Sequence, residues 1–155
     1  MSNVYDKLKE LRLTLPEPPQ KGGVYTQCVE FGSNLVYVSG CGPDMNGNQK
    51  IKGKLGEISI EEGQEAAKCC ALNVLAILHR DLGDLNRIKK FVKCITFVAS
   101  TKDFYYQPQV ANGASNFLIE LFGEEKGRPA RSAIGVNVLP GNIPVEIEYL
   151  IELVD

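Results

Sequence analysis

Hydrophobic and polar residues alternate most regularly at the end of the chain. Every second side chain from Val145 to Leu153 is apolar or aromatic, and three of the four between them are glutamates. Successive strand side chains point to opposite faces of a sheet. The pattern therefore predicts a strand over residues 144–154, with one face in the core and a second face of mixed polarity.

Helical spacing occupies two stretches of the middle of the chain. Ser59 and Glu62 form an S-x-x-E capping box, which predicts a helix over residues 60–82 ending at Gly83. A second helix is expected up to residue 122, with Asp103 as a candidate cap and Pro108 near its start. The apolar stripes that support these helices are Ala67, Cys70, Ala71, Val74, Leu75 and Leu78, and then Val110, Ala114, Phe117, Leu118 and Leu121.

The remaining patterns indicate a short N-terminal helix and four more strands. A helix over residues 4–13 is followed by a proline-rich break at 15–19. Runs at 24–31 and 34–39, separated by Gly32-Ser33, predict a hairpin, and further strands are expected at 88–99 and 133–139. This order predicts an α+β sandwich, a mixed sheet with two helices packed on one face. A second sheet face that is partly apolar favours oligomerisation.

Length and composition place these elements in one domain. The 155 residues suit a single domain spanning 1–155, in which 1–21 form the N-terminal helix and proline-rich lead-in. The net charge of −2 argues against a nucleic-acid binder that depends on a basic face. No apolar run approaches the roughly 20 residues that span a bilayer, and the N-terminus lacks signal-peptide character. A cytoplasmic protein without a membrane partner is expected.

Cysteine and histidine usage excludes several chemistries. The five cysteines are odd in number and lack a C-x-x-C pair, which indicates reduced thiols rather than a disulfide framework. The single histidine, His79, lacks the partners that a zinc site or a Ser-His-Asp triad requires. We expect no metal and no cofactor. Cys41 lies between glycines and is either a reachable thiol or, as free cysteines more often are, a buried one.

Candidate chemistry is concentrated near residues 129–148. Arg131 stands at the start of an apolar strand, and Glu146 follows in the next strand after a Pro-Gly-Asn turn. A guanidinium group matches a carboxylate with two parallel hydrogen bonds, and a glutamate can hold a water or a proton. Together they outline a site for a small anionic substrate. The alternative is that Arg131 pairs with a neighbouring acid and Glu146 is an ordinary surface residue.

At these residues the chain resembles the RidA family, the YjgF-type reactive-intermediate deaminases also labelled endoribonuclease L-PSP. The resemblance rests on Pro129-Ala130-Arg131-Ser132 with the following strand to Leu139, and on Val145-Glu146-Ile147. It is supported by Tyr25 leading into Val38-Ser39-Gly40, and by the 91–98 strand followed by Asn112. It implies a chorismate-mutase-like fold, a homotrimer, and clefts between subunits.

The resemblance also implies roles for individual residues. Arg131 would bind the substrate carboxylate, and Glu146 would position the attacking water. Tyr25, Ser39 and Asn112 would line the cleft, and backbone groups at Ser132 and Ala133 would meet the substrate. The implied reaction is hydrolytic deamination of small 2-imino or enamine acids.

The sequence departs from the family pattern at several positions, and other functions remain as alternatives to the deaminase. Ala133 stands where deaminases often carry cysteine, Cys41-Gly42 replace a glutamine and an aliphatic residue, and Asn137 occupies a position that is usually small or basic. The segment 105–109 looks inserted and the N-terminal helix is extra, so a divergent subgroup is expected. The alternatives are a non-catalytic regulator that binds small carboxylates and an endoribonuclease or translation inhibitor, which the acidic balance disfavours. Chorismate mutase activity is a further option, which fold likeness alone does not establish.

Overall fold

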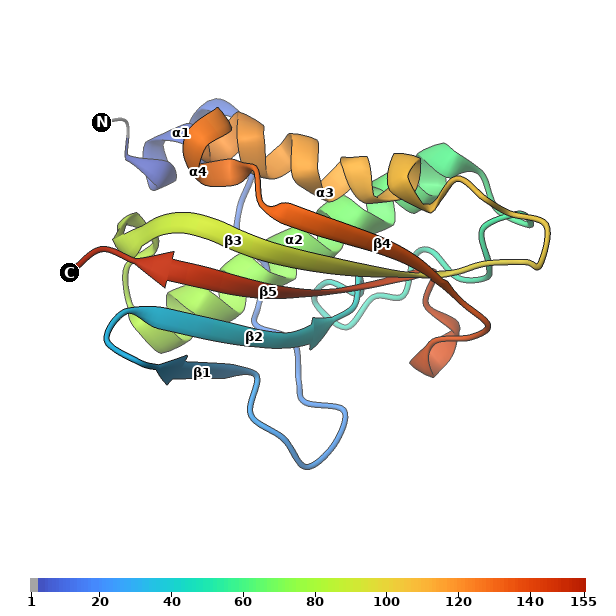
Figure 1. Ribbon diagram of the computed structural model, residues 1–155, viewed down its shortest axis with the longest axis horizontal. Helices are drawn as coiled ribbons and strands as arrows, with labels where there is room; N and C mark the ends of the chain where they lie inside the picture. Colours follow the sequence, from blue (N-terminus) through green and yellow to red (C-terminus); the bar gives the residue numbers. More distant parts are fainter. Residues whose placement is uncertain (1–2) are drawn as a thin grey trace.

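The sheet and its two long helices form two layers. The computed structural model describes residues 3–155, and Figure 1 shows α2 and α3 together on one side of a five-stranded sheet. The strands are β1 (Cys28–Phe31), β2 (Leu35–Cys41), β3 (Ile88–Ala99), β4 (Ala130–Val136) and β5 (Val145–Leu153). The helices are α1 (Val4–Glu10), α2 (Ile60–Leu82), α3 (Gln107–Phe122) and α4 (Glu124–Gly127), with 3₁₀ turns at Leu85–Arg87 and Pro140–Asn142.

The sheet is mixed, with spatial order β1-β2-β5-β3-β4. β1 and β2 form the hairpin predicted around Gly32, whose φ of 61° is accessible to glycine. β5 lies between β2 and β3 and pairs antiparallel with both, so the strongest alternating segment occupies the centre. β4 runs parallel to β3 and is reached through α3. The expected α+β sandwich with two helices on one face is confirmed.

The long helix begins and ends where its sequence predicts. Ser59 accepts a hydrogen bond from the Glu62 N–H, and the Glu62 carboxylate accepts one from the Ser59 N–H, so the capping box is complete. Gly83 ends the helix with φ 80°. The core between this helix and the sheet includes fully buried Phe91 and Tyr149 from the central strands. Their rings meet edge to face, with centroids 5.5 Å apart.

The predicted start of one helix and the predicted end of another were wrong. α3 begins at Gln107, not after Asp103, because residues 101–104 close a separate turn from the Phe104 N–H to the Thr101 carbonyl. Pro108 then lies in the first turn, where its missing N–H costs nothing. α1 ends at Glu10, and Arg12 beyond it adopts a positive φ of 55°. The short helix α4 had not been predicted.

Two strand boundaries also differ from expectation. β1 begins at Cys28, because the Thr26 carbonyl accepts the Ser39 hydroxyl and the Tyr25 hydroxyl accepts the Gly22 N–H. Residues 24–27 therefore form a loop. β4 spans Ala130–Val136 and so begins three residues earlier than expected, because parallel pairing with β3 starts at Ala130. Arg131 consequently lies inside a strand.

A tyrosine is one of the attachments of the N-terminal helix, beside its buried Val4 and Leu8. The Tyr5 hydroxyl accepts the Leu85 N–H at 2.9 Å and forms a second hydrogen bond with the Nδ1 atom of His79 at 3.0 Å. The Tyr5 and His79 rings also meet edge to face, with centroids 5.6 Å apart. The single histidine of the chain therefore anchors α1 to the end of α2.

The face of the sheet away from the helices is partly apolar. On β5, the residues pointing away from the core are Glu146, Glu148, Leu150 and Glu152. The register places further apolar side chains on this face, namely Val29, Phe31, Tyr37 and Ile134, each 42–46% exposed. A single chain leaves this open face uncovered.

Candidate active site

Arg131 projects from β4 toward α3, where neutral groups hold it. One guanidinium nitrogen, Nη1, donates to the Asn112 Oδ1 atom at 2.8 Å and to the Ser115 hydroxyl at 3.1 Å. The other, Nη2, donates to the Pro108 carbonyl at 3.4 Å. Asn112 and Ser115 are neighbours on one face of α3 because they are three residues apart. Strand β4 and helix α3 therefore fix the guanidinium from two sides.

The charge of Arg131 has no carboxylate partner within residues 3–155. The ion pairs formed by these residues involve other cations, including Arg128, which pairs with Glu124 at 2.8 Å. The expectation that Arg131 could simply pair with a neighbouring acid is therefore wrong for this part of the chain. Both arginines line an open polar cavity of about 360 Å³ with Asn112, Ser115 and Asn116. Such a cavity suits an anion.

Glu146 lies on β5 against the β2 strand. A Cβ atom placed at Gly40 would come within 2.7 Å of the Glu146 Oε1 atom, so only glycine admits the carboxyl in its observed position. Burial, followed by the charge of Glu148, raises the pKa of Glu146 above its ordinary value. A carboxyl with a raised pKa is suited to proton transfer near neutral pH.

A second cavity, of about 300 Å³, surrounds the Glu146 carboxyl. Tyr25 and Gln20 line it from the loop before β1, and Gly40 and Cys41 line it from β2. Gln27 holds this loop in place: its side chain donates to the Pro19 carbonyl at 2.8 Å and accepts from the Arg80 guanidinium at 3.1 Å. Burial raises the pKa of Cys41 to about 12, which favours an inert thiol at this position.

One chain does not bring Arg131 and Glu146 together. Arg131 is in register with Cys94 of β3, whose neighbour on β5 is Tyr149, and its side chain contacts a helix. Glu146 is in register with Phe97 and belongs to the set of β5 side chains that point away from the helices. The two groups therefore lie on opposite sides of the sheet and line separate cavities.

The other residues expected at the site are distributed between these two clusters or lie beside them. Asn112 joins Arg131, and Tyr25 joins Glu146. The Ser39 hydroxyl is engaged by the Thr26 carbonyl at 2.6 Å, and the Ser132 hydroxyl accepts the Lys93 ammonium at 2.9 Å. Ala133, half-buried on β4, is in register with Thr96.

Sequence reasoning missed three contributors to these clusters. They are the Ser115 hydroxyl, the Pro108 carbonyl and the close approach of Gly40 to Glu146. The spacing of Asn112 and Ser115 on one helical face was a usable signal for the first. The strand pairing between β2 and β5, which brings Gly40 to Glu146, could not be read from the chain.

Comparison with known proteins agrees with this architecture. Residues 6–153 match the family described as "YjgF/chorismate mutase-like, putative endoribonuclease". The chain belongs to this family. Protein TCP17 of Trypanosoma cruzi is 42% identical over 147 residues, which cover 94% of this chain and 91% of that protein. The 2-iminobutanoate/2-iminopropanoate deaminase of Dermatophagoides farinae is 30% identical over 140 residues, covering 90% and 93% respectively.

A solved structure resembles the chain over nearly its whole length. The crystal structure of protein Atu1372 from Agrobacterium tumefaciens, whose function is described as unknown, superposes with a TM-score of 0.89. It is 39% identical, and the alignment covers 97% of this chain and 92% of that one. The chorismate-mutase-like fold expected from the family resemblance is therefore confirmed.

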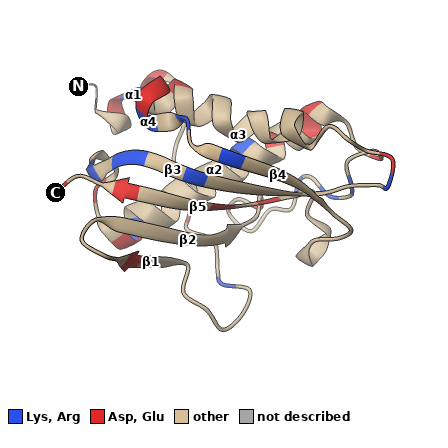
Figure 2. Ribbon diagram, in the orientation of Figure 1, with Lys and Arg blue, Asp and Glu red and all other residues tan. Residues whose placement is uncertain are grey.

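Charged side chains of both signs are spread over the described elements. Figure 2 shows Lys and Arg interspersed with Asp and Glu along the described elements. Within residues 3–155, no three His, Cys, Asp or Glu side chains are grouped so as to hold a metal ion. No helix among these residues is long and apolar enough to cross a membrane.

Proposed function

We propose that this protein is a hydrolytic deaminase of small 2-imino or enamine acids, acting in clefts between subunits of a homotrimer. The observation that carries this proposal is the guanidinium of Arg131, which neutral acceptors orient while its charge remains unpaired. A substrate carboxylate supplies the missing negative charge. Membership of a family in which one relative is named a 2-iminobutanoate/2-iminopropanoate deaminase points to the same substrate class.

A second copy of the chain would complete the site. Arg131 and Glu146 face opposite sides of one sheet, so a substrate held by Arg131 of one subunit would meet Glu146 and Tyr25 of another. The exposed apolar residues of the open face, among them Tyr37 and Ile134, support such an assembly.

The chemistry requires orientation more than activation. When the imine nitrogen is protonated, the imine carbon is electrophilic. Water adds to this carbon and gives a tetrahedral carbinolamine. Glu146 accepts a proton from the attacking water and returns it to the nitrogen. As the C–N bond breaks, the Glu146 carboxylate takes the proton of the carbinolamine hydroxyl, ammonia leaves and the 2-oxo acid forms. Arg131 fixes the carboxylate so that the imine carbon faces that water.

The direct test measures ammonia and 2-oxobutanoate released from 2-iminobutanoate that a threonine dehydratase generates in the same cuvette. Acceleration over the spontaneous rate is expected for the wild type and is lost in Arg131→Ala. Arg128→Ala is the matched control because it removes a second arginine from the same cavity, one that already pairs with Glu124. A wild-type rate equal to the spontaneous rate would refute the deaminase.

The same experiment separates the deaminase from a carboxylate-binding regulator. The separation of Arg131 and Glu146 within one chain is the observation that favours the regulator, because binding alone needs only the arginine. A protein that binds 2-oxobutanoate through Arg131 without accelerating imine hydrolysis would be such a regulator.

A further inference from the structure

A further cavity among residues 3–155 belongs to neither of the two clusters described above. It has a volume of about 490 Å³ and lies where α1, the 3₁₀ turn before β3 and the C-terminal end of α3 meet. Its lining residues differ entirely from those around Arg131 and Glu146. Its volume lies within the ordinary range for small-molecule sites.

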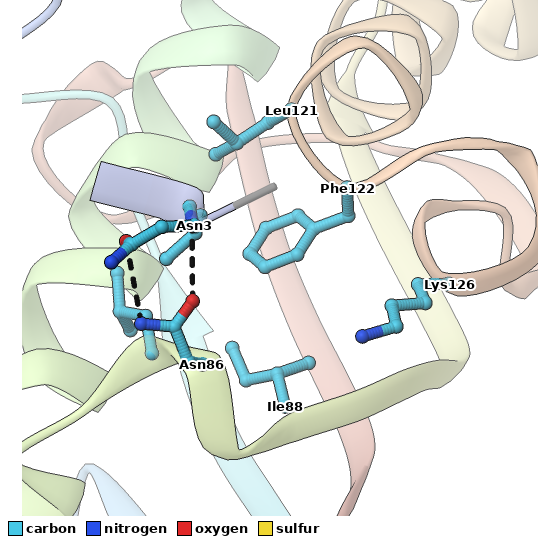
Figure 3. A pocket seen from close by; sticks show the side chains of 8 residues that line it. Asn3, Asn86, Ile88, Leu121, Phe122 and Lys126 are labelled. Atoms are coloured by element: carbon cyan, nitrogen blue, oxygen red, sulfur yellow. Dashed lines mark hydrogen bonds between the residues drawn. The ribbon is translucent and has the colours of Figure 1, made fainter. Parts of the chain in front are cut away.

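Five apolar and three polar residues line this cavity. Ile88, Leu121 and Phe122 lie around it, and two further aliphatic side chains line it from α1 and the 3₁₀ turn (Figure 3). The Phe122 ring packs edge to face on Phe91, with centroids 5.2 Å apart, so the wall is anchored to the core. An apolar ligand segment would therefore meet a preformed surface rather than a flexible one.

Two of the three polar lining residues already have partners. The Asn86 side chain accepts the Val4 N–H at 3.1 Å and donates to the Asn3 side chain at 3.4 Å. Asn3 in turn accepts the Tyr5 N–H at 2.9 Å. These two amides close the rim beside α1, and their hydrogen bonds are used within the protein (Figure 3).

Lys126 is the third polar residue and has no such partner. Its side chain extends from α4 into the cavity, toward Ile88 and Phe122 (Figure 3). No hydrogen bond or ion pair to its ammonium group occurs within the described part of the chain, although the side chain is half-buried. Lys126 is the one cationic side chain that lines the cavity among residues 3–155, and beside apolar side chains it is complementary to one negative charge attached to an apolar body.

We propose that this cavity binds an amphipathic monocarboxylate, with the carboxylate on Lys126 and the hydrocarbon chain against Ile88, Leu121 and Phe122. Charge complementarity selects the anionic head, and the shape and polarity of the walls select the aliphatic tail. The site depends on α1, which supplies part of its wall, and so on the Tyr5 anchor that holds this helix. It is independent of the proposed imine hydrolysis, because it shares no residue with Arg131 or Glu146.

Octanoate is the probe, titrated into the full chain and followed by calorimetry and by amide chemical shifts. We expect saturable binding with a Kd of about 1 mM or tighter, and shifts centred on Lys126 and Phe122. Lys126→Met keeps most of the apolar stem, removes the charge and should weaken octanoate binding about tenfold. Lys102→Met, at an exposed loop position outside the cavity, is the matched control and should bind as the wild type does.

Charge reversal gives the sharpest outcome. Lys126→Glu should lose octanoate and gain octylamine, which has the same chain and the opposite charge, whereas a merely structural role of Lys126 would not exchange the two ligands. Octanoate binding that is equal in the wild type and Lys126→Met would overturn the proposal. So would the absence of saturable binding to the wild type, or shifts centred away from this cavity.

Discussion

Asn112→Asp tests whether Arg131 must remain unpaired to bind a substrate. The Asn112 Oδ1 atom lies 2.8 Å from the guanidinium, so a carboxylate there would form a direct ion pair without rearrangement. Two unit charges about 4 Å apart interact by about 4 kcal/mol near a protein surface. Solvent screening reduces measured exposed pairs to about 0.2–1 kcal/mol. Because Arg131 is half-buried, we expect the new ion pair to weaken carboxylate binding by an intermediate amount, about 1–2 kcal/mol.

Affinity and stability should change in opposite directions. The new carboxylate occupies the place of the substrate carboxylate, so affinity for 2-oxobutanoate should fall about tenfold. The free energy of unfolding should stay level or rise by up to about 1 kcal/mol, because an ion pair replaces a neutral hydrogen bond. Calorimetric titration gives the affinity, KM for 2-iminobutanoate gives an independent comparison, and urea denaturation gives the stability.

Asn116→Asp is the matched control for this change. Asn116 lines the same cavity one turn further along α3 and makes no hydrogen bond to Arg131 among the described residues. Asn116→Asp adds the same charge without the direct contact to Arg131 and should weaken 2-oxobutanoate binding less than Asn112→Asp does. Unchanged affinity in Asn112→Asp, or an equal loss in both variants, would refute the idea that the neutral partners of Arg131 keep its charge available.

Three further changes probe the opposite cluster and the N-terminal anchor. Gly40→Ala brings a methyl group within 2.7 Å of the Glu146 carboxyl and should lower kcat/KM by about 10- to 100-fold; an unchanged kcat/KM would contradict this reasoning. Burial and the charge of Glu148 raise the pKa of Glu146 above 4.5, and an acid with a raised folded-state pKa stabilises most below its ordinary pKa and loses this contribution as pH rises through the raised value. Glu146→Gln should therefore gain stability relative to the wild type as the pH rises from the ordinary pKa of a glutamate through the raised pKa of Glu146, and a constant difference in urea denaturation would contradict this. Tyr5→Phe leaves a backbone N–H without its acceptor and should cost about 1–2 kcal/mol in the same assay; a cost near zero would show that α1 is held by its apolar contacts alone.

Local signals predicted the regular elements well. The S-x-x-E box and Gly83 set both ends of α2, and the alternation from Val145 to Leu153 identified the central strand and its two faces. These elements are determined by contacts within a few residues or by a repeated burial pattern. The confirmed arrangement of two helices on one face follows from the same apolar stripes.

Other features depend on pairing between distant segments, which local sequence patterns do not predict. β4 starts at Ala130 because β3 pairs with it there, and residues 24–27 leave the sheet because Thr26 and Ser39 bond through a side chain. Asp103 resembled a helix cap, yet Pro108 suited the first turn of a helix that begins later. In each case a tertiary contact outweighed a local preference.

The candidate site shows the same division. Motif spacing outlined Arg131 and Glu146 as a pair, and the family resemblance added Asn112 as a residue lining the cleft; its contact with Arg131 was not predicted and comes from the structure. The placement of Arg131 and Glu146 on opposite sides of one sheet required the register of three strands, β3, β4 and β5. It is this separation that makes a second copy of the chain necessary for the proposed chemistry.

Complementation between two inactive variants measures that requirement directly. Arg131→Ala and Glu146→Gln are each assayed alone for 2-iminobutanoate hydrolysis, then unfolded together in equal amounts, refolded and assayed again. If each site combines Arg131 of one subunit with Glu146 of another, random assembly restores about a quarter of the sites, and the mixture should regain about that share of wild-type acceleration. Two inactive variants whose refolded mixture stays inactive, although mixed oligomers form, would contradict a site shared between subunits.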